Sequence, residues 1–158
     1  MAGAAILVSP SVPGALLLVP LAVALRLTGN LLDGALARRT GRVHARGELY
    51  NEVGDRSADV LMLAPVAFVP GAIAAAVWAG VVLALLASFT AVATKAAGGT
   101  RTYRGILSKP GRMALLTVCA IGVLVLGPDA WWPFGPLLAI GAALTLAERV
   151  LVAVRELP

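Results

Sequence analysis

Charged residues are scarce in this chain of 158 residues, at 13% of the total, and it has one cysteine and one histidine. A soluble domain has roughly 25% charged residues, so the composition excludes an ordinary soluble enzyme. Cys119 stands alone, which excludes an internal disulfide, and we expect His44 to be solvated among arginines. What is abundant is hydrocarbon, since 59% of the residues are hydrophobic and the mean hydropathy is +0.91. The chain is predicted to be an integral membrane protein.

Five apolar stretches are long enough to cross a bilayer, which needs about 20 residues. The predicted spans are 12–37, 48–69, 72–94, 112–128 and 133–154. Pro70-Gly71 and Gly98-Gly99 mark two of the breaks between them. The apolar runs are continuous rather than alternating, which favours helices over strands. We therefore predict one domain over residues 1–158, an all-α polytopic membrane helix bundle with about five transmembrane helices.

The basic residues predict the orientation of this bundle. All thirteen Lys and Arg residues lie in the segments 26–56, 95–112 and 149–155. Because basic connections face the cytoplasm, the N-terminus is predicted outside and the C-terminus inside, with Trp131 and Trp132 in an outer interfacial loop. The net charge of +5 then indicates contact with anionic lipid headgroups and phosphates rather than with nucleic acid.

Polar residues of the first two spans fall on helical stripes. On the first span Asn30 lies about 60° and Arg26 about 20° from Asp33, and Arg26 is predicted either to partner Asp33 or to extend to the surface. The second stripe repeats every four residues and contains Gly47, Asn51, Asp55 and Asp59. If the two helices are antiparallel neighbours, these stripes face each other and offer oxygen ligands suited to Mg²⁺ or Mn²⁺. The alternative is a polar helix pair that merely packs together.

Residues 30–55 resemble the signature of the CDP-alcohol phosphatidyltransferases, D-x-x-D-G-x-x-A-R-x8-G-x-x-x-D-x-x-x-D. Asp33 and Asp55 match its second and fourth aspartates, whereas Asn30 and Asn51 stand at the first and third. The remaining signature positions are unchanged, and they are Gly34, Ala37, Arg38 and Gly47. The surrounding sequence resembles a bacterial branch of the family with asparagine at both places.

The resemblance implies a six-helix fold that lacks its first helix here, with residues 1–9 as the last turns of that helix. It implies transfer of a phosphatidyl group from CDP-diacylglycerol to an alcohol with release of CMP, in phospholipid biosynthesis at the bacterial inner membrane. Asp55 would be the general base, and a homodimer is a further implication. Mg²⁺ or Mn²⁺ would be held by Asn30, Asp33, Asn51 and Asp55, and substrate would be bound by Gly34, Ala37, Arg38 and Gly47.

A second basic segment, residues 101–112, resembles the family's cytoplasmic loop in which Lys and Arg contact a substrate phosphate. Lys109 and Arg112 lie three residues apart at a helix start and are candidates to clamp an anion. An ordinary positively charged loop explains the segment equally well.

The two asparagines remove two negative charges from the predicted metal site. Glu48 and Asp59 lie within about 40° of Asp55 on a helical wheel and are candidates to restore that charge. Besides an active transferase, the sequence allows a catalytically impaired relative that binds CDP-lipid or a partner without turnover. A transporter is disfavoured because the charged residues cluster at one membrane face. No motif identifies the acceptor alcohol.

Overall fold

The computed structural model describes residues 1–40 and 45–157, and within these ranges the side chains of residues 33–40 and 45 are outside the description. Throughout the described ranges the regular structure is helical. The elements in chain order are α1 (Ala2–Val8), η1 (Pro13–Leu17), α2 (Leu18–Thr40), α3 (Ala45–Leu63), η2 (Ala64–Phe68), α4 (Ala74–Ala96), α5 (Lys109–Leu126), η3 (Pro128–Trp131) and α6 (Phe134–Glu156).

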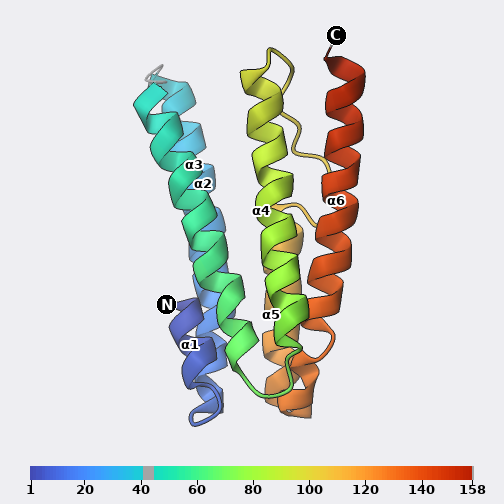
Figure 1. The fold of residues 1–158 in the computed structure, drawn as a ribbon. Helices are drawn as coiled ribbons and strands as arrows, with labels where there is room; N and C mark the ends of the chain where they lie inside the picture. Colours follow the sequence, from blue (N-terminus) through green and yellow to red (C-terminus); the bar gives the residue numbers. More distant parts are fainter. Residues whose placement is uncertain (41–44, 158) are drawn as a thin grey trace.

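Four of the five predicted spans are confirmed as helices long and apolar enough to cross a membrane. These are Pro13–Leu32, Ala74–Ala96, Lys109–Leu126 and Pro128–Glu156. The fifth prediction, 48–69, corresponds to α3 and η2, which run alongside the other helices (Figure 1). α3 is not among these helices, because it contains charged residues throughout most of its length, among them Glu48, Glu52, Asp55, Arg56 and Asp59. Asp55 and Asp59 have cationic partners inside the bundle.

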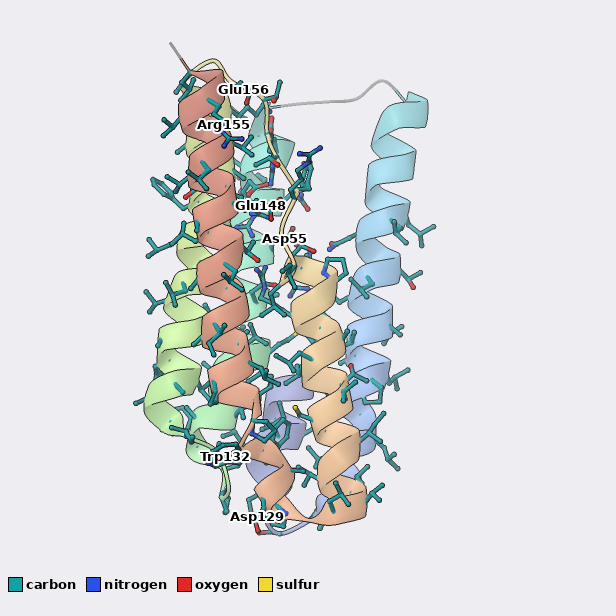
Figure 2. All side chains as sticks on the ribbon, turned by 90° about the vertical axis from the view of Figure 1, so that its right-hand side faces the viewer. Asp55, Asp129, Trp132, Glu148, Arg155 and Glu156 are labelled. Atoms are coloured by element: carbon teal, nitrogen blue, oxygen red, sulfur yellow. The ribbon has the colours of Figure 1, made fainter. Side chains whose placement is uncertain are left out.

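The basic segments meet at one end of the bundle. Figure 1 places the last turns of α2, α4 and α6 and the first turns of α3 together at the top, with η2 and η3 at the opposite end. We call the end of the bundle at the top of Figure 1 the basic end. α5 is set back, since Figure 2 shows its first turn below the ends of α4 and α6, beside Asp55. The residues between α4 and α5 therefore descend into the bundle from the basic end.

Glycines allow α4 and α6 to pack closely together. A Cβ atom on Gly80 would lie 2.6 Å from Cγ of Leu138, and one on Gly135 would lie 2.9 Å from the backbone nitrogen of Val77. Small residues such as Ala79-Gly80 and those in the stretch 135–141 can also form contacts between two chains in a membrane. In the structure Gly80 and Gly135 instead form the contact between α4 and α6 of one molecule.

α1 is a short helix that packs against the lower part of α3 and η2. A Cβ on Gly3 would lie 2.2 Å from the carbonyl oxygen of Leu61 and 3.0 Å from Pro65, so the absence of a side chain permits the contact. Ala5 and Ile6 are buried beside it. Residues 1–9 therefore pack as part of the bundle, and the chain bends at Ser9 and Pro10 before η1.

The two tryptophans of the connection between α5 and α6 have different surroundings. Trp132 is exposed, which agrees with the predicted interfacial position, but Trp131 is 1% exposed. The Trp131 ring meets Phe134 edge to face, with centroids 5.8 Å apart. Trp131 is thus a core residue, since η3 turns its indole inward, and the prediction of an interfacial role is wrong for it.

Candidate functional site

Asp55 on α3 lies beside Lys109, the first residue of α5. The Lys109 ammonium donates to Oδ1 of Asp55 over 2.6 Å, and each side chain is 19% exposed. Nη2 of Arg26, from α2, lies 3.6 Å from the same oxygen. Three helices therefore meet at one partly accessible carboxylate. No described residue forms a hydrogen bond or ion pair with the other oxygen, Oδ2.

Asp59 lies one turn deeper on α3 and is held between two guanidinium groups. Nη2 of Arg26 donates to Oδ1 over 2.8 Å, and Nη2 of Arg112, from α5, donates to Oδ2 over 2.7 Å. Arg112 also donates to the carbonyl oxygen of Leu107. Asp59 is 3% exposed, so a buried charge in this part of the bundle has partners on both oxygens.

The predicted stripe on α3 divides into a packed part and an exposed part. Asp55 and Asp59 point into the bundle, whereas Asn51 and Gly47 are exposed. On α2, Asn30 is half-buried. The sequence predicts that α2 and α3 pack along each other, and the structure differs. Their basic ends are separated in Figure 2, and α2 packs mainly on α5 and α1. Four predicted site residues belong to α2 but have side chains outside the described residues, and they are Asp33, Gly34, Ala37 and Arg38.

The candidate charge substitutes, Glu48 and Asp59, are engaged elsewhere. Glu48 forms an exposed ion pair with Lys95 of α4. Asp59 is buried with a guanidinium on each oxygen, so its negative charge is already paired with Arg26 and Arg112. Neither carboxylate restores the charge that Asn30 and Asn51 lack. The guanidinium of Arg26 contacts the carboxylates of Asp55 and Asp59 on α3. Its predicted pairing with Asp33 involves a side chain outside the described residues.

The predicted phosphate clamp of Lys109 and Arg112 is divided in the same way. Lys109 lies at the partly accessible carboxylate of Asp55. The Arg112 side chain is 2% exposed and points toward Asp59. A direct contact between Arg112 and a substrate phosphate does not fit this geometry, because the guanidinium is enclosed and already paired. Lys109 keeps the position that such a contact requires.

Carboxylate and amide oxygens, the groups at the signature positions, suit a hard divalent cation. In the structure the described partners of the Asp55 carboxylate are two cations, Lys109 and Arg26. Among the described residues, however, no group of three or more His, Cys, Asp or Glu lies together as a metal cluster. A metal held here would therefore depend on Asp55, on Asp33 from α2 and on the amide oxygens of Asn30 and Asn51. It would also compete with Lys109 for the Asp55 carboxylate.

Residues 97–108, between α4 and α5, are attached to neighbouring helices by contacts that the sequence pattern does not predict. Arg101 pairs with Glu52 of α3, which also accepts from Arg56. Arg149 of α6 donates to the carbonyl oxygens of Arg104, over 2.9 Å, and Ala87, over 2.7 Å. These bonds fix the segment that delivers Lys109 to the site.

Thr145 holds the same segment further down α6. Its hydroxyl accepts from the backbone N–H of Leu107 over 3.0 Å and donates to the carbonyl oxygen of Gly141 over 2.8 Å. One signal in the sequence was available: Thr145 and Arg149 are four residues apart and lie on one face of an apolar helix. Polar residues on such a face indicate an internal partner, but they do not say which segment provides it.

Gly105 is expected to be indispensable for this attachment. Its φ is +128°, and a Cβ there would lie 2.2 Å from Cγ2 of Thr145. Gly105→Ala is expected to destabilise the protein by about 1–3 kcal/mol through backbone strain alone, and the contact with Thr145 adds to this loss. Gly98→Ala is the matched control, since φ is +93° there and nothing lies within 4 Å. Thermal unfolding in detergent compares the two, and equal losses would contradict a steric role for Thr145.

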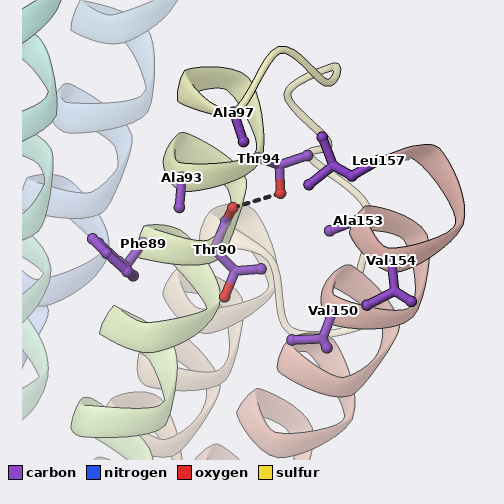
Figure 3. Close-up of a pocket in the computed structure, with 9 residues that line it drawn as sticks. All are labelled: Phe89, Thr90, Ala93, Thr94, Ala97, Val150, Ala153, Val154 and Leu157. Carbon is purple, nitrogen blue, oxygen red and sulfur yellow. Dashed lines mark hydrogen bonds between the residues drawn. The ribbon is translucent and has the colours of Figure 1, made fainter.

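A separate groove of about 480 Å³ lies between the basic-end halves of α4 and α6 (Figure 3). Its lining is almost wholly apolar, from residues such as Phe89, Ala93, Val150 and Val154. The Thr94 hydroxyl donates within its own helix, to the carbonyl oxygen of Thr90. The groove thus offers few polar contacts and does not include Asp55.

Comparison with known proteins finds similarity to a bacterial membrane protein. The inner membrane protein YnbA of Escherichia coli (strain K12) is 25% identical over 146 residues, which cover 89% of this chain and 73% of YnbA. No family model matches the sequence. No solved structure matches either. The similarity to an inner membrane protein and the four long apolar helices identify a bacterial membrane protein built as an all-α polytopic bundle.

Proposed function

We propose that this protein is a phosphatidyltransferase of the bacterial inner membrane, with its basic end facing the cytoplasm. It would move the phosphatidyl group of CDP-diacylglycerol to an alcohol and release CMP, in phospholipid biosynthesis. The observation that supports this most directly is the meeting of Asp55 and Lys109. A motif carboxylate on α3 and a basic residue 54 positions later share one partly accessible site, as a reaction at a phosphate requires.

Each side chain at this site has a role that its chemistry supports. The Asp55 carboxylate accepts the proton of the acceptor hydroxyl. The acceptor oxygen then bonds to the phosphorus of the phosphatidyl group, the bond from that phosphorus to the oxygen of CMP breaks, and CMP leaves with the electron pair. The Lys109 ammonium binds a phosphate oxygen of the donor. Mg²⁺ or Mn²⁺, held by Asp33 and Asp55 with the amide oxygens of Asn30 and Asn51, would supply further positive charge against the pyrophosphate.

The experiment that tests this proposal measures CMP release from CDP-diacylglycerol by the purified protein. A panel of acceptor alcohols is supplied with Mn²⁺ or Mg²⁺, and a parallel reaction contains EDTA. We expect CMP release that depends on both the metal and one class of alcohol. CMP release that is unaffected by EDTA would contradict the proposed requirement for a metal. Absence of CMP release with every alcohol would contradict the proposed transferase activity.

A second candidate function is a protein that binds CDP-lipid without turnover. Two observations favour it: asparagine at positions 30 and 51, and an ammonium group already seated on Asp55. It predicts saturable binding of CDP-diacylglycerol with no CMP formed. The variant Asn30→Asp/Asn51→Asp, run alongside, should then gain affinity for Mn²⁺, measured by calorimetry.

A further inference from the structure

We propose that Arg26, Asp59 and Arg112 form a positioning triad that sets the rotation of α3 about its axis and thereby aims Asp55 at the site. The inference that the triad orients Asp55 for catalysis rests on the proposed function. The inference that it fixes the rotation of α3 does not. None of the three belongs to the signature in residues 30–55. All three lie behind Asp55, deeper in the bundle than Lys109.

Arg26 contacts α3 on two successive turns. Its Nη2 donates to the carboxylate of Asp59 over 2.8 Å and to the backbone carbonyl of Asp55 over 2.9 Å. It lies 3.6 Å from the Asp55 carboxylate as well. A backbone contact fixes the helix itself, not merely a side chain. Arg26 therefore ties α2 to the turn of α3 on which Asp55 stands.

α5 contacts the same two turns from another side. Lys109 pairs with Asp55, and Arg112, three residues later, pairs with Asp59. Residues three or four apart lie on one face of a helix, so the two pairs form successive rungs between α5 and α3. A rotation of α3 by one residue position, about 100°, would break both rungs and the Arg26 contacts together.

Stability alone is a poor explanation for this arrangement. Well-packed apolar residues often replace a buried ion pair without loss of stability, and one established use of buried ionic groups is to specify register. Within the part of the chain that the structure describes, the cluster also leaves Nε of Arg26 and Nε of Arg112 buried without hydrogen-bond partners. Three cationic and two anionic side chains make up the set of Arg26, Lys109, Arg112, Asp55 and Asp59. The cluster therefore does not pair every charge. Its geometry instead favours a role in specifying one rotation of α3 about its axis.

The test compares Arg26→Gln with Arg56→Gln. Both remove a guanidinium that pairs with a carboxylate of α3, but Arg56 belongs to α3 itself and pairs with Glu52 one turn earlier. Arg56→Gln leaves the contacts of Arg26 in place, so we expect Arg26→Gln to lower thermal stability more. Arg26→Gln should in addition lower kcat for CMP release by about 10- to 100-fold, because misplacement of a reacting group by 1 Å has effects of that size. The KM for CDP-diacylglycerol should change little, and Arg26→Lys should recover part of the rate.

A measurement without catalysis separates the inference from the proposed function. Spin labels are placed on two exposed positions, Leu31 of α2 and Tyr50 of α3, in a Cys119→Ala background. We expect Arg26→Gln to broaden the distance distribution between the labels, and Arg56→Gln to leave it unchanged. If Arg26→Gln does not fold, Arg26→Lys replaces it. An unchanged distribution would overturn the triad, whereas a broadened one in a protein without CMP release would overturn the transferase alone.

Discussion

Asp55→Asn is expected to lower CMP release by at least about 100-fold, the lower range for loss of a general base. The amide cannot accept the proton of the acceptor hydroxyl, and it is a neutral and weaker ligand for a metal. Its size is unchanged, so the packing of α3 between Lys109 and Arg26 is preserved. Initial rates of CMP release at saturating CDP-diacylglycerol provide the measurement, normalised to the amount of folded protein.

Glu48→Gln is the matched control for that experiment. Glu48 lies two turns earlier on α3 and also pairs with a lysine, Lys95, but that pair is exposed. The control should keep the wild-type rate. Activity that survives Asp55→Asn at more than about a tenth of the wild-type rate would remove Asp55 from the role of general base.

Asp59→Asn is expected to cause the largest loss of stability, about 3–5 kcal/mol, the range for breaking a buried pair at one partner. The loss arises because Arg26 and Arg112 would face each other in a buried environment with no carboxylate between them. Reversible unfolding in mixed micelles, followed by circular dichroism, measures the change.

The same Glu48→Gln variant provides the comparison for stability. Exposed ion pairs contribute about 1 kcal/mol or less, so Glu48→Gln should unfold close to the wild-type protein. If Asp59→Asn were no more destabilising than Glu48→Gln, the buried network would contribute no more than a surface pair. The assignment of Asp59 as a central ionic residue would then be wrong.

The helices and the basic end could be predicted because each depends on local sequence. Long apolar runs specify spans, and proline and glycine mark their ends. The partners of Arg26 could not be predicted, because a helical wheel gives the phase of a residue on its own helix but not the neighbour that it faces. Arg26 shares a face with Asp33, but its guanidinium reaches α3.

The same limit applies to the second basic segment. Lys109 and Arg112 share a helix face, and their spacing indicated a common role at a phosphate. The depth at which α5 begins separates them, since it places Lys109 at a partly accessible carboxylate and encloses Arg112 beside Asp59. That depth is fixed by contacts distant in sequence, such as the bond from Leu107 to Thr145.

The pairing of Asp55 with Lys109 also has a consequence for biosynthesis. The two residues are 54 positions apart, so the acidic side of the site is synthesised well before its basic side. Until α5 enters the membrane, Asp59 has Arg26 as its described cationic partner, and Asp55 lacks its lysine. Because unpaired charges at membrane depth cost several kcal/mol, α3 is stably accommodated in the bilayer late, when α5 arrives. Assembly of the site and completion of the bundle are then a single event.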